Sequence, residues 1–140
     1  MANQLDDVLQ IHLRTFKDER GNLVPIESKF DSLMSIKRVF YVYDVPEGFT
    51  RGKHSHIKTS QLMICVSGKC LVRCFDGAAW GEYSLQTPNQ ALFVPPGIWS
   101  EETYVESGST LMVLCDTHYD QGDYIFSLEE FEKLKEDEIV

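Results

Sequence analysis

The sequence predicts an all-β protein, an antiparallel sandwich or barrel with one short helix near its C-terminus. The chain has 140 residues, the size of one ordinary domain, so we expect a single domain over residues 1–140. Hydrophobic residues make up 43% and aromatic residues 11% of the chain, which is typical of a folded globular protein. Short β-branched and aromatic runs recur between turn signals, with no internal repeat. This spacing favours antiparallel strands.

The predicted strands cover residues 11–16, 23–26, 35–45, 54–58, 61–67, 69–75, 79–85, 90–94, 99–104 and 110–117. Two turn signals support them, because Ser67-Gly68 separates two runs and Asp76-Gly77 offers the positive φ of a tight hairpin turn. The Pro-Pro-Gly sequence at residues 95–97 cannot continue a strand ladder. We expect a turn there, at the mouth of the barrel, with the next side chains at the rim or in the interior.

Only the last segment, about residues 127–137, predicts a helix. Ser127 followed by Glu130 is a capping-box pattern, and Leu128, Phe131 and Leu134 recur at helical spacing as one apolar stripe. We expect this helix to close or flank the barrel. Its other face is interpreted as a solvated surface that carries Glu129, Glu132, Lys133, Lys135, Glu136, Asp137 and Glu138.

Charge and cysteine content narrow the classes of partner. Lys and Arg number 13 against 22 Asp and Glu, so the net charge is -9 and nucleic acid is not an expected partner. No apolar run approaches the roughly 18 to 20 residues of a membrane-spanning helix, and residues 1–10 are too polar for a signal peptide, so we expect no membrane partner and a cytoplasmic location. The four cysteines lie in apolar runs and are expected to be buried: Cys65, Cys70, Cys74 and Cys115.

The residues with chemical potential are concentrated in the segment Arg-Gly-Lys-His-Ser-His at residues 51–56. In an extended strand alternate residues share a face, so His54 and His56 project together. Two imidazoles on one wall favour metal ligation or proton transfer, whereas two partly exposed surface histidines would have no chemical role. His12 and His118 lack such a context and are interpreted as structural.

The His-x-His strand resembles the first cupin motif, in which a metal-binding glutamate follows the two histidines and a later Pro-x-Gly motif supplies another histidine. Here Gln61 occupies the glutamate position and Ser100 the later histidine position. A neutral amide and a hydroxyl give no charge compensation to a divalent ion, so we expect no metal. His54 and His56 are then free to titrate, as acid/base chemistry requires.

Within the cupins, the chain resembles the sugar-nucleotide 3,4-ketoisomerases, the WxcM-like group that acts on dTDP-4-keto-6-deoxyglucose. The landmarks follow in order over residues 16–124: Arg-Gly-Asn-Leu at 20–23 with Glu27, Ser-Ile-Lys-Arg-Val-Phe-Tyr at 35–41, the segment 51–56, Pro-Pro-Gly-Ile-Trp at 95–99, and Asp-Tyr-Ile at 123–125. The resemblance implies a cupin jelly-roll barrel, a homodimer, and transfer of a carbonyl from carbon 4 to carbon 3 without a cofactor, a step of deoxysugar biosynthesis.

By this resemblance His54 is the acid/base at carbon and His56 moves the proton between the oxygens on carbons 3 and 4. The residues alone do not order the two histidines. Arg20 favours a galacto product, whereas Ser100 matches neither the galacto nor the gluco producers of the family. The expected substrate-binding residues are Arg51, Arg20, Arg38, Ser100, Trp99 and Tyr124.

Two other functions stay open on the sequence. A dTDP-sugar 3,5-epimerase shares the Arg-Gly-x-His strand but would want a tyrosine acid opposite the histidine. A cupin that binds a sugar nucleotide without turning it over would need the arginines and aromatic residues, but it would not need a titratable histidine pair.

Overall fold

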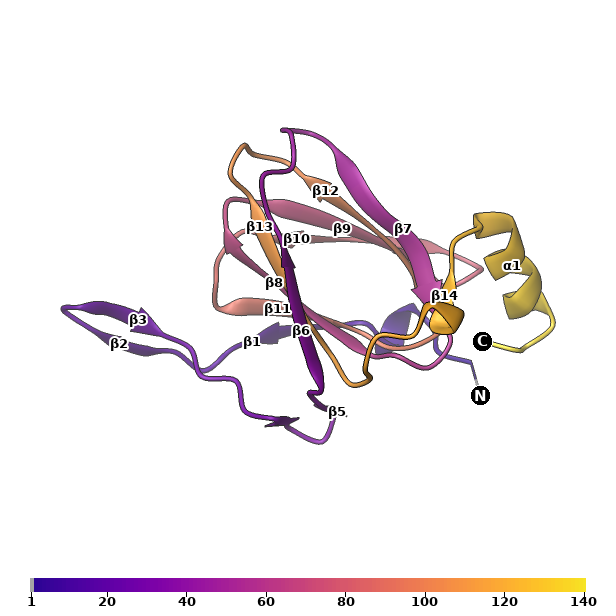
Figure 1. The fold of residues 1–140 in the computed structure, drawn as a ribbon, viewed down its shortest axis with the longest axis horizontal. Coiled ribbons are helices and arrows are strands. Elements are labelled where there is room, and N and C mark those ends of the chain that lie inside the picture. Colours follow the sequence, from indigo (N-terminus) through magenta and orange to yellow (C-terminus); the bar gives the residue numbers. More distant parts are fainter. Residues whose placement is uncertain (1) are drawn as a thin grey trace.

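The computed structural model describes residues 2–140, which form two facing five-stranded antiparallel sheets and one short helix (Figure 1). The strand order is β1-β11-β8-β13-β6 in the first sheet and β10-β9-β12-β7-β14 in the second. From β6 onward the chain crosses between the sheets at every connection except that between β9 and β10. This topology is a jelly-roll sandwich, so the predicted all-β fold is confirmed, although the two sheets face one another rather than joining into one closed barrel.

The first sheet contains β1 (Leu9–His12), β11 (Gln90–Val94), β8 (Gln61–Ser67), β13 (Thr110–Cys115) and β6 (Arg38–Val42). The second contains β10 (Trp80–Leu85), β9 (Cys70–Phe75), β12 (Trp99–Tyr104), β7 (Thr50–His56) and β14 (Tyr124–Ile125). Two ribbons lie outside the sheets: β2 (Phe16–Asp18) with β3 (Gly21–Leu23), and β4 (Lys29–Phe30) with β5 (Met34–Ser35). The remaining elements are the 3₁₀ turns η1 (Leu5–Asp7) and η2 (Gln121–Asp123) and the helix α1 (Leu128–Glu136).

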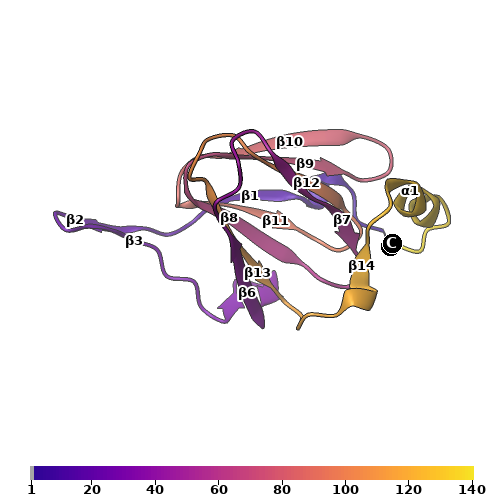
Figure 2. The same ribbon diagram turned by 45° about the horizontal axis from the view of Figure 1, so that its top comes forward.

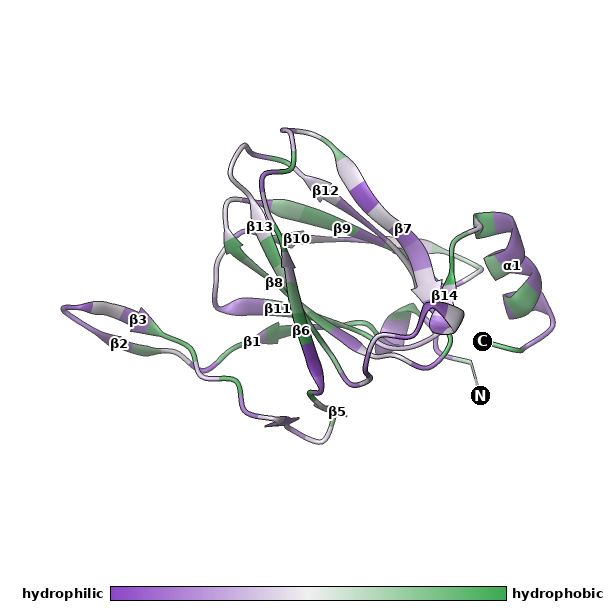
Figure 3. Ribbon diagram, in the orientation of Figure 1, coloured by the Kyte–Doolittle hydropathy of each residue, from purple (hydrophilic) through white to green (hydrophobic). Residues whose placement is uncertain are grey.

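The main core lies between the two sheets. Alternate residues of β9 show why these strands form: Cys70, Val72 and Cys74 are fully buried, while Arg73 between them reaches the surface. Apolar residues accordingly concentrate on the central strands in Figure 3, whereas β7 and α1 carry hydrophilic stretches. All four cysteines are buried and free, as predicted. No helix among residues 2–140 has the length and apolar character needed to cross a membrane.

A second apolar cluster covers the outer face of the first sheet. Leu62, Ile64 and Leu114 point away from the main core and pack against Leu13 and Met34 from the N-terminal segment. The first sheet is therefore buried on both faces, which explains the continuous burial along residues 61–65 of β8.

The structure corrects the predicted bounds of the N-terminal strands. Residues 11–16 are not one strand, because β1 ends at His12 and the chain leaves the sheet at Leu13, whose N–H donates to the Asn89 carbonyl at 2.7 Å. The following β2–β3 ribbon projects far from the sandwich, and it is called the arm below (Figure 1). The expected strand 35–45 is likewise divided, since the Lys37 N–H donates to the Cys115 carbonyl between β5 and β6.

The C-terminal helix forms as predicted and closes one end of the sandwich (Figure 2). The Ser127 hydroxyl accepts a hydrogen bond from the Glu130 N–H at 3.2 Å, which caps the first turn. Phe131 is fully buried against Phe75, Trp99 and Ile125, so the apolar stripe anchors the helix on the outer face of the second sheet.

We expect Phe131→Ala to lower the free energy of unfolding by about 3 kcal/mol, because it removes a fully buried ring and leaves a cavity under the helix. Ile139→Ala is the matched control, since Ile139 is exposed on the same C-terminal segment and its loss should cost under about 0.5 kcal/mol. Urea unfolding followed by circular dichroism measures both. Equal midpoints for the two variants would show that α1 is not anchored through this ring.

Candidate active site

Strand β7 presents both predicted histidines to the same region, at the end of the sandwich where β14 joins the second sheet (Figure 2). The His54 and His56 rings lie 5.0 Å apart in an edge-to-face arrangement. His56 is only 4% exposed and His54 is half-buried. The shared face predicted from alternation along the strand is confirmed.

A bulge in β7 sets the position of His54. Against β12, His54 lies opposite Ser100 and Arg51 lies opposite Glu102, so β7 carries one extra residue in this interval. Gly52 and Lys53 absorb it with φ values of 93° and 38°. The Gly52 carbonyl then accepts a hydrogen bond from His54 Nδ1 at 2.5 Å, which fixes the orientation of the imidazole ring. The sequence prediction began this strand at His54 and did not foresee the bulge.

Asp123 holds the other histidine, and the sequence pattern assigned it no role. Its Oδ2 accepts from His56 Nδ1 at 2.9 Å and from the Thr59 hydroxyl, while Oδ1 accepts from the Lys58 N–H at 2.6 Å. The 3₁₀ turn η2 and strand β14 place this buried carboxylate beside β7. Only the Asp-Tyr-Ile landmark at residues 123–125 pointed to this segment, because a two-residue strand leaves no periodic signal.

Hydrogen bonding at both Nδ1 atoms leaves the Nε2 atoms to do chemistry. Nε2 of His54 and Nε2 of His56 are buried and have no hydrogen-bond partner among residues 2–140. Burial lowers the pKa of His54, against the bond to Gly52, and lowers the pKa of His56 to about 4, against the attraction of Asp123. Each ring is therefore neutral at pH 7 and keeps a basic lone pair at Nε2.

Aromatic and cationic side chains surround the pair. The Tyr124 ring lies 4.3 Å from the His56 ring and 5.1 Å from the His54 ring, and it stacks on Phe126 at 5.3 Å. The Tyr124 hydroxyl accepts from Arg38 Nη1 at 3.5 Å, and Arg38 Nε is buried without a partner among the described residues. The structure thus brings Arg38 and Tyr124 together with the histidines, and Ser100 beside His54.

Three predicted substrate residues lie elsewhere within the single chain. Trp99 packs in the cluster beneath α1 and donates from Nε1 to Glu101 at 3.0 Å, so its ring does not face the histidines. Arg20 lies on the arm with its side chain 85% exposed and pairs with Asp18 at 2.7 Å. Arg51 is exposed at the start of β7, three residues before His54.

The cupin metal positions offer a poor donor set. Gln61 is buried and its amide approaches the Cys115 sulfur at 3.9 Å, and Ser100 supplies only a hydroxyl. No three His, Cys, Asp or Glu side chains within residues 2–140 gather as a metal-binding group. Two neutral imidazoles, an amide and a hydroxyl give a divalent cation no charge compensation, so these residues do not fit one.

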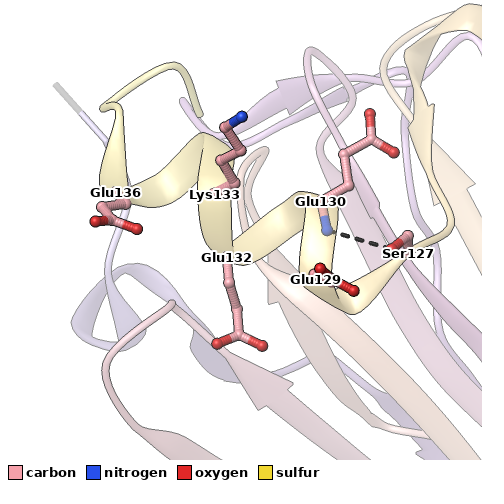
Figure 4. A pocket seen from close by; sticks show the side chains of 6 residues that line it. All are labelled: Ser127, Glu129, Glu130, Glu132, Lys133 and Glu136. Atoms are coloured by element: carbon pink, nitrogen blue, oxygen red, sulfur yellow. Dashed lines mark hydrogen bonds between the residues drawn. The ribbon is translucent and has the colours of Figure 1, made fainter.

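A shallow hollow over α1 differs from the histidine site, because its lining is mainly acidic (Figure 4). Its acidic side chains would repel an anionic ligand, which agrees with the prediction that this helix face is solvated. Lys135 is an exception to that prediction, because its Nζ is half-buried and donates to the Asn3 carbonyl at 2.7 Å. The hollow is lined by Ser127, Glu129, Glu130, Glu132, Lys133 and Glu136.

A jelly-roll sandwich with a His-x-His strand at one end defines a cupin-like protein, and comparison with known proteins identifies its family. The family model described as "FdtA: WxcM-like, C-terminal" matches residues 6–136. The chain belongs to this WxcM-like family, as the sequence landmarks predicted.

Three similar proteins are named as 3,4-ketoisomerases or 3,4-oxoisomerases. The TDP-4-oxo-6-deoxy-alpha-D-glucose-3,4-oxoisomerase of Aneurinibacillus thermoaerophilus is 37% identical over 123 residues, which cover 88% of each chain. The sugar 3,4-ketoisomerase QdtA of Thermoanaerobacterium thermosaccharolyticum, solved with TDP, superposes with a TM-score of 0.91 at 32% identity over 98% of this chain and 100% of that one. A 3,4-ketoisomerase from Helicobacter canadensis superposes with a TM-score of 0.89 at 31% identity, over 94% of this chain and 98% of that one.

We expect nuclear magnetic resonance titration to find His56 protonating near pH 4 and the pKa of His54 lowered from its ordinary value, because burial opposes the imidazolium form of both rings. Activity that requires the neutral His56 ring is then lost as the pH falls through about 4. A His56 midpoint above pH 6.5 would contradict this account of the site.

Proposed function

We propose that this protein is a TDP-sugar 3,4-ketoisomerase that converts TDP-4-keto-6-deoxyglucose into the 3-keto isomer. The observation that carries the proposal is the pair of neighbouring histidines on β7, whose rings lie 5.0 Å apart and whose buried Nε2 atoms have no hydrogen-bond partner among the described residues. The family supports it, since the curated relative is named an oxoisomerase of this sugar, and a histidine-to-asparagine variant of QdtA has been solved with TDP-4-keto-6-deoxyglucose.

The proposed reaction moves hydrogens only as protons. A base removes the proton from carbon 3, and the electron pair of that bond delocalises toward the carbonyl oxygen on carbon 4, giving an enediolate. A proton is then delivered to carbon 4, while the proton of the carbon 3 hydroxyl passes to the oxygen on carbon 4, so that carbon 3 carries the new carbonyl. No electron leaves the sugar, so the balance is complete without a redox cofactor.

The two histidines divide these transfers. We assign His54 Nε2 as the acid/base that takes the proton from carbon 3 and delivers one to carbon 4. His56 Nε2 moves the proton between the two oxygens, and the hydrogen bond from its Nδ1 to Asp123 keeps it in the tautomer that accepts at Nε2. Asp123 acts through His56 and is a positioning residue.

The nucleotide requires local cations because the protein as a whole is acidic. Arg51 precedes the bulge at the start of β7, and its forked guanidinium suits diphosphate oxygens. The buried, unpartnered Nε of Arg38 beside Tyr124 offers a second donor near the histidines. The half-buried Tyr124 stacks on the exposed Phe126, and this pair supplies an aromatic face for the base or sugar.

We also propose that the protein is a homodimer. Strand β6 lies at the edge of the first sheet and leaves Val39, Tyr41 and Tyr43 on its outer side about 54 to 65% exposed. The arm itself extends away from the sandwich (Figure 1), and it adds the exposed ring of Phe16. A second copy seated on these surfaces would bury them, and the arm could then carry Arg20 to the site of the other subunit.

Two finer features belong to the same proposal. Arg20 supports a galacto configuration at carbon 4 of the product, because the resemblance associates an arginine at this position with galacto producers; Ser100 supports neither configuration.

The four buried, free cysteines support a reducing compartment, and we propose the cytoplasm.

The test is incubation with TDP-4-keto-6-deoxyglucose in heavy water, with the deuterium position read by nuclear magnetic resonance. We expect label at carbon 4 of a 3-keto product, with coupling constants of the galacto form. His54→Asn should reduce exchange on the order of 100-fold or more, because it removes the carbon base. His56→Asn should retain part of the exchange but form product slowly.

Arg51→Ala is the matched variant outside the proton relay. It should raise KM with little change in kcat, since a phosphate contact is made equally in the ground and transition states. Activity should also survive exhaustive chelation. Label at carbons 3 and 5 would identify an epimerase, and recovery of unlabelled, unchanged substrate a binding protein; either result would refute the isomerase.

For the dimer, light scattering should give a mass about twice the 16.1 kDa of the chain. Tyr41→Asp should shift the protein toward monomer, because it places a charge on the face proposed to be covered. Phe49→Asp is the control, since Phe49 is similarly exposed but lies outside β6 and the arm. A wild-type monomer, or dissociation by both variants alike, would argue against this interface.

A further inference from the structure

The carboxyl group of Glu102 is a buried polar group that the proposed reaction does not use. Glu102 is 6% exposed, and its Oε2 atom has no hydrogen-bond partner in the described part of the chain. It lies on β12 two residues after Ser100, and therefore on the same face as the residue opposite His54. A buried carboxyl group without a partner is costly, so its presence calls for a role.

This carboxyl group fills the space that a side chain at residue 52 would need. A Cβ atom placed on Gly52 would lie 1.9 Å from Glu102 Oε2 and 2.8 Å from its Cδ. Gly52 also has a φ of 93°, which favours glycine. The glycine and the carboxyl group are thus fitted to each other at the bulge of β7.

The same peptide unit orients His54. The Gly52 carbonyl accepts a hydrogen bond from His54 Nδ1, so a shift of the bulge would turn the His54 ring or break this hydrogen bond. We propose that Glu102 is a positioning residue for His54: its carboxyl group packs over Gly52 and holds the bulge in the setting where the Gly52 carbonyl fixes the His54 ring. The effect on catalysis rests on the proposed function, whereas the effect on the ring does not.

The protonation state of Glu102 gives this role a pH dependence. Burial and the neighbouring Glu101 raise the pKa of Glu102 to about 8, against the attraction of Arg51. The carboxyl group is therefore neutral at pH 7 and ionises as the pH rises through about 8. An ionised carboxylate would be drawn away from Gly52 toward Arg51 and solvent, so the bulge is held below that pH and released above it.

The other titratable groups packed around Glu102 do not produce the same transition. Burial raises the pKa of the Cys74 thiol and of the Tyr104 hydroxyl, and the hydrogen bond with Cys65 raises that of the Cys70 thiol. Each of these pKa values is therefore shifted further away from pH 8. The groups that face Glu102 are Arg51 on β7, Cys70 and Cys74 on β9, and Glu101 and Tyr104 on β12.

The direct test is the His54 imidazole signal in nitrogen-15 spectra of the full chain between about pH 6 and pH 10. We expect a transition with a midpoint near pH 8 in the wild type. Glu102→Gln should abolish the transition and keep the low-pH spectrum, because the amide has the same shape and no charge. Glu101→Gln is the control that removes a carboxylate from the same strand; it should keep the transition and lower its midpoint.

Glu102→Ala removes the packing itself. It should disturb the His54 signals at every pH, leave the His56 signals unchanged because Asp123 holds that ring, and reduce kcat on the order of 10-fold to 100-fold. A transition that persists in Glu102→Gln, or His54 signals unaffected in a folded Glu102→Ala, would overturn the proposal. Should these spectra respond while no isomerisation is detected in the wild type, the proposed function would fail and the positioning role would stand.

Discussion

The site depends on two hydrogen bonds, one at Nδ1 of each histidine. Because Gly52 and Asp123 both accept from Nδ1, both rings carry their proton at Nδ1 and present a lone pair at Nε2. A bare His-x-His strand fixes only the face on which the rings lie. The two acceptors fix their tautomers and rotations, which decide whether the pair can exchange protons with a ligand.

The jelly roll explains how such different acceptors reach one strand. Strand β7 lies between β12 and β14, so one neighbour sets the register that creates the bulge at Gly52 and the other brings Asp123 beside His56. The two neighbours come from distant parts of the chain, and the sandwich core holds them against the first sheet. Both histidines are therefore held in place by the sheet that carries them.

The sequence predicted features that local periodicity encodes and missed those that depend on long-range contacts. The capped helix at Ser127, the buried cysteines and the shared face of His54 and His56 follow from spacing alone. The ring of Trp99 was assigned to substrate binding through its landmark, but α1 offers it an apolar surface, and it packs there. Asp123 and Glu102 carry no local signal, because each acquires its place only when β7 meets its neighbouring strands.

Burial shifts the pKa values of the groups around β7 in opposite directions, and in each case it favours the neutral form. It lowers the pKa of His54 and His56, whose charged forms are cations, and raises that of Glu102, whose charged form is an anion. All three are therefore neutral over a range of pH that includes 7. An enediol spreads developing negative charge over two oxygens, and neutral imidazoles can give and take its protons without a fixed ion pair that would have to be broken. Arg38 beside Tyr124 adds to this effect, because its positive charge also lowers the pKa of His56 and so favours the neutral imidazole, while Arg51 lies exposed at the start of β7.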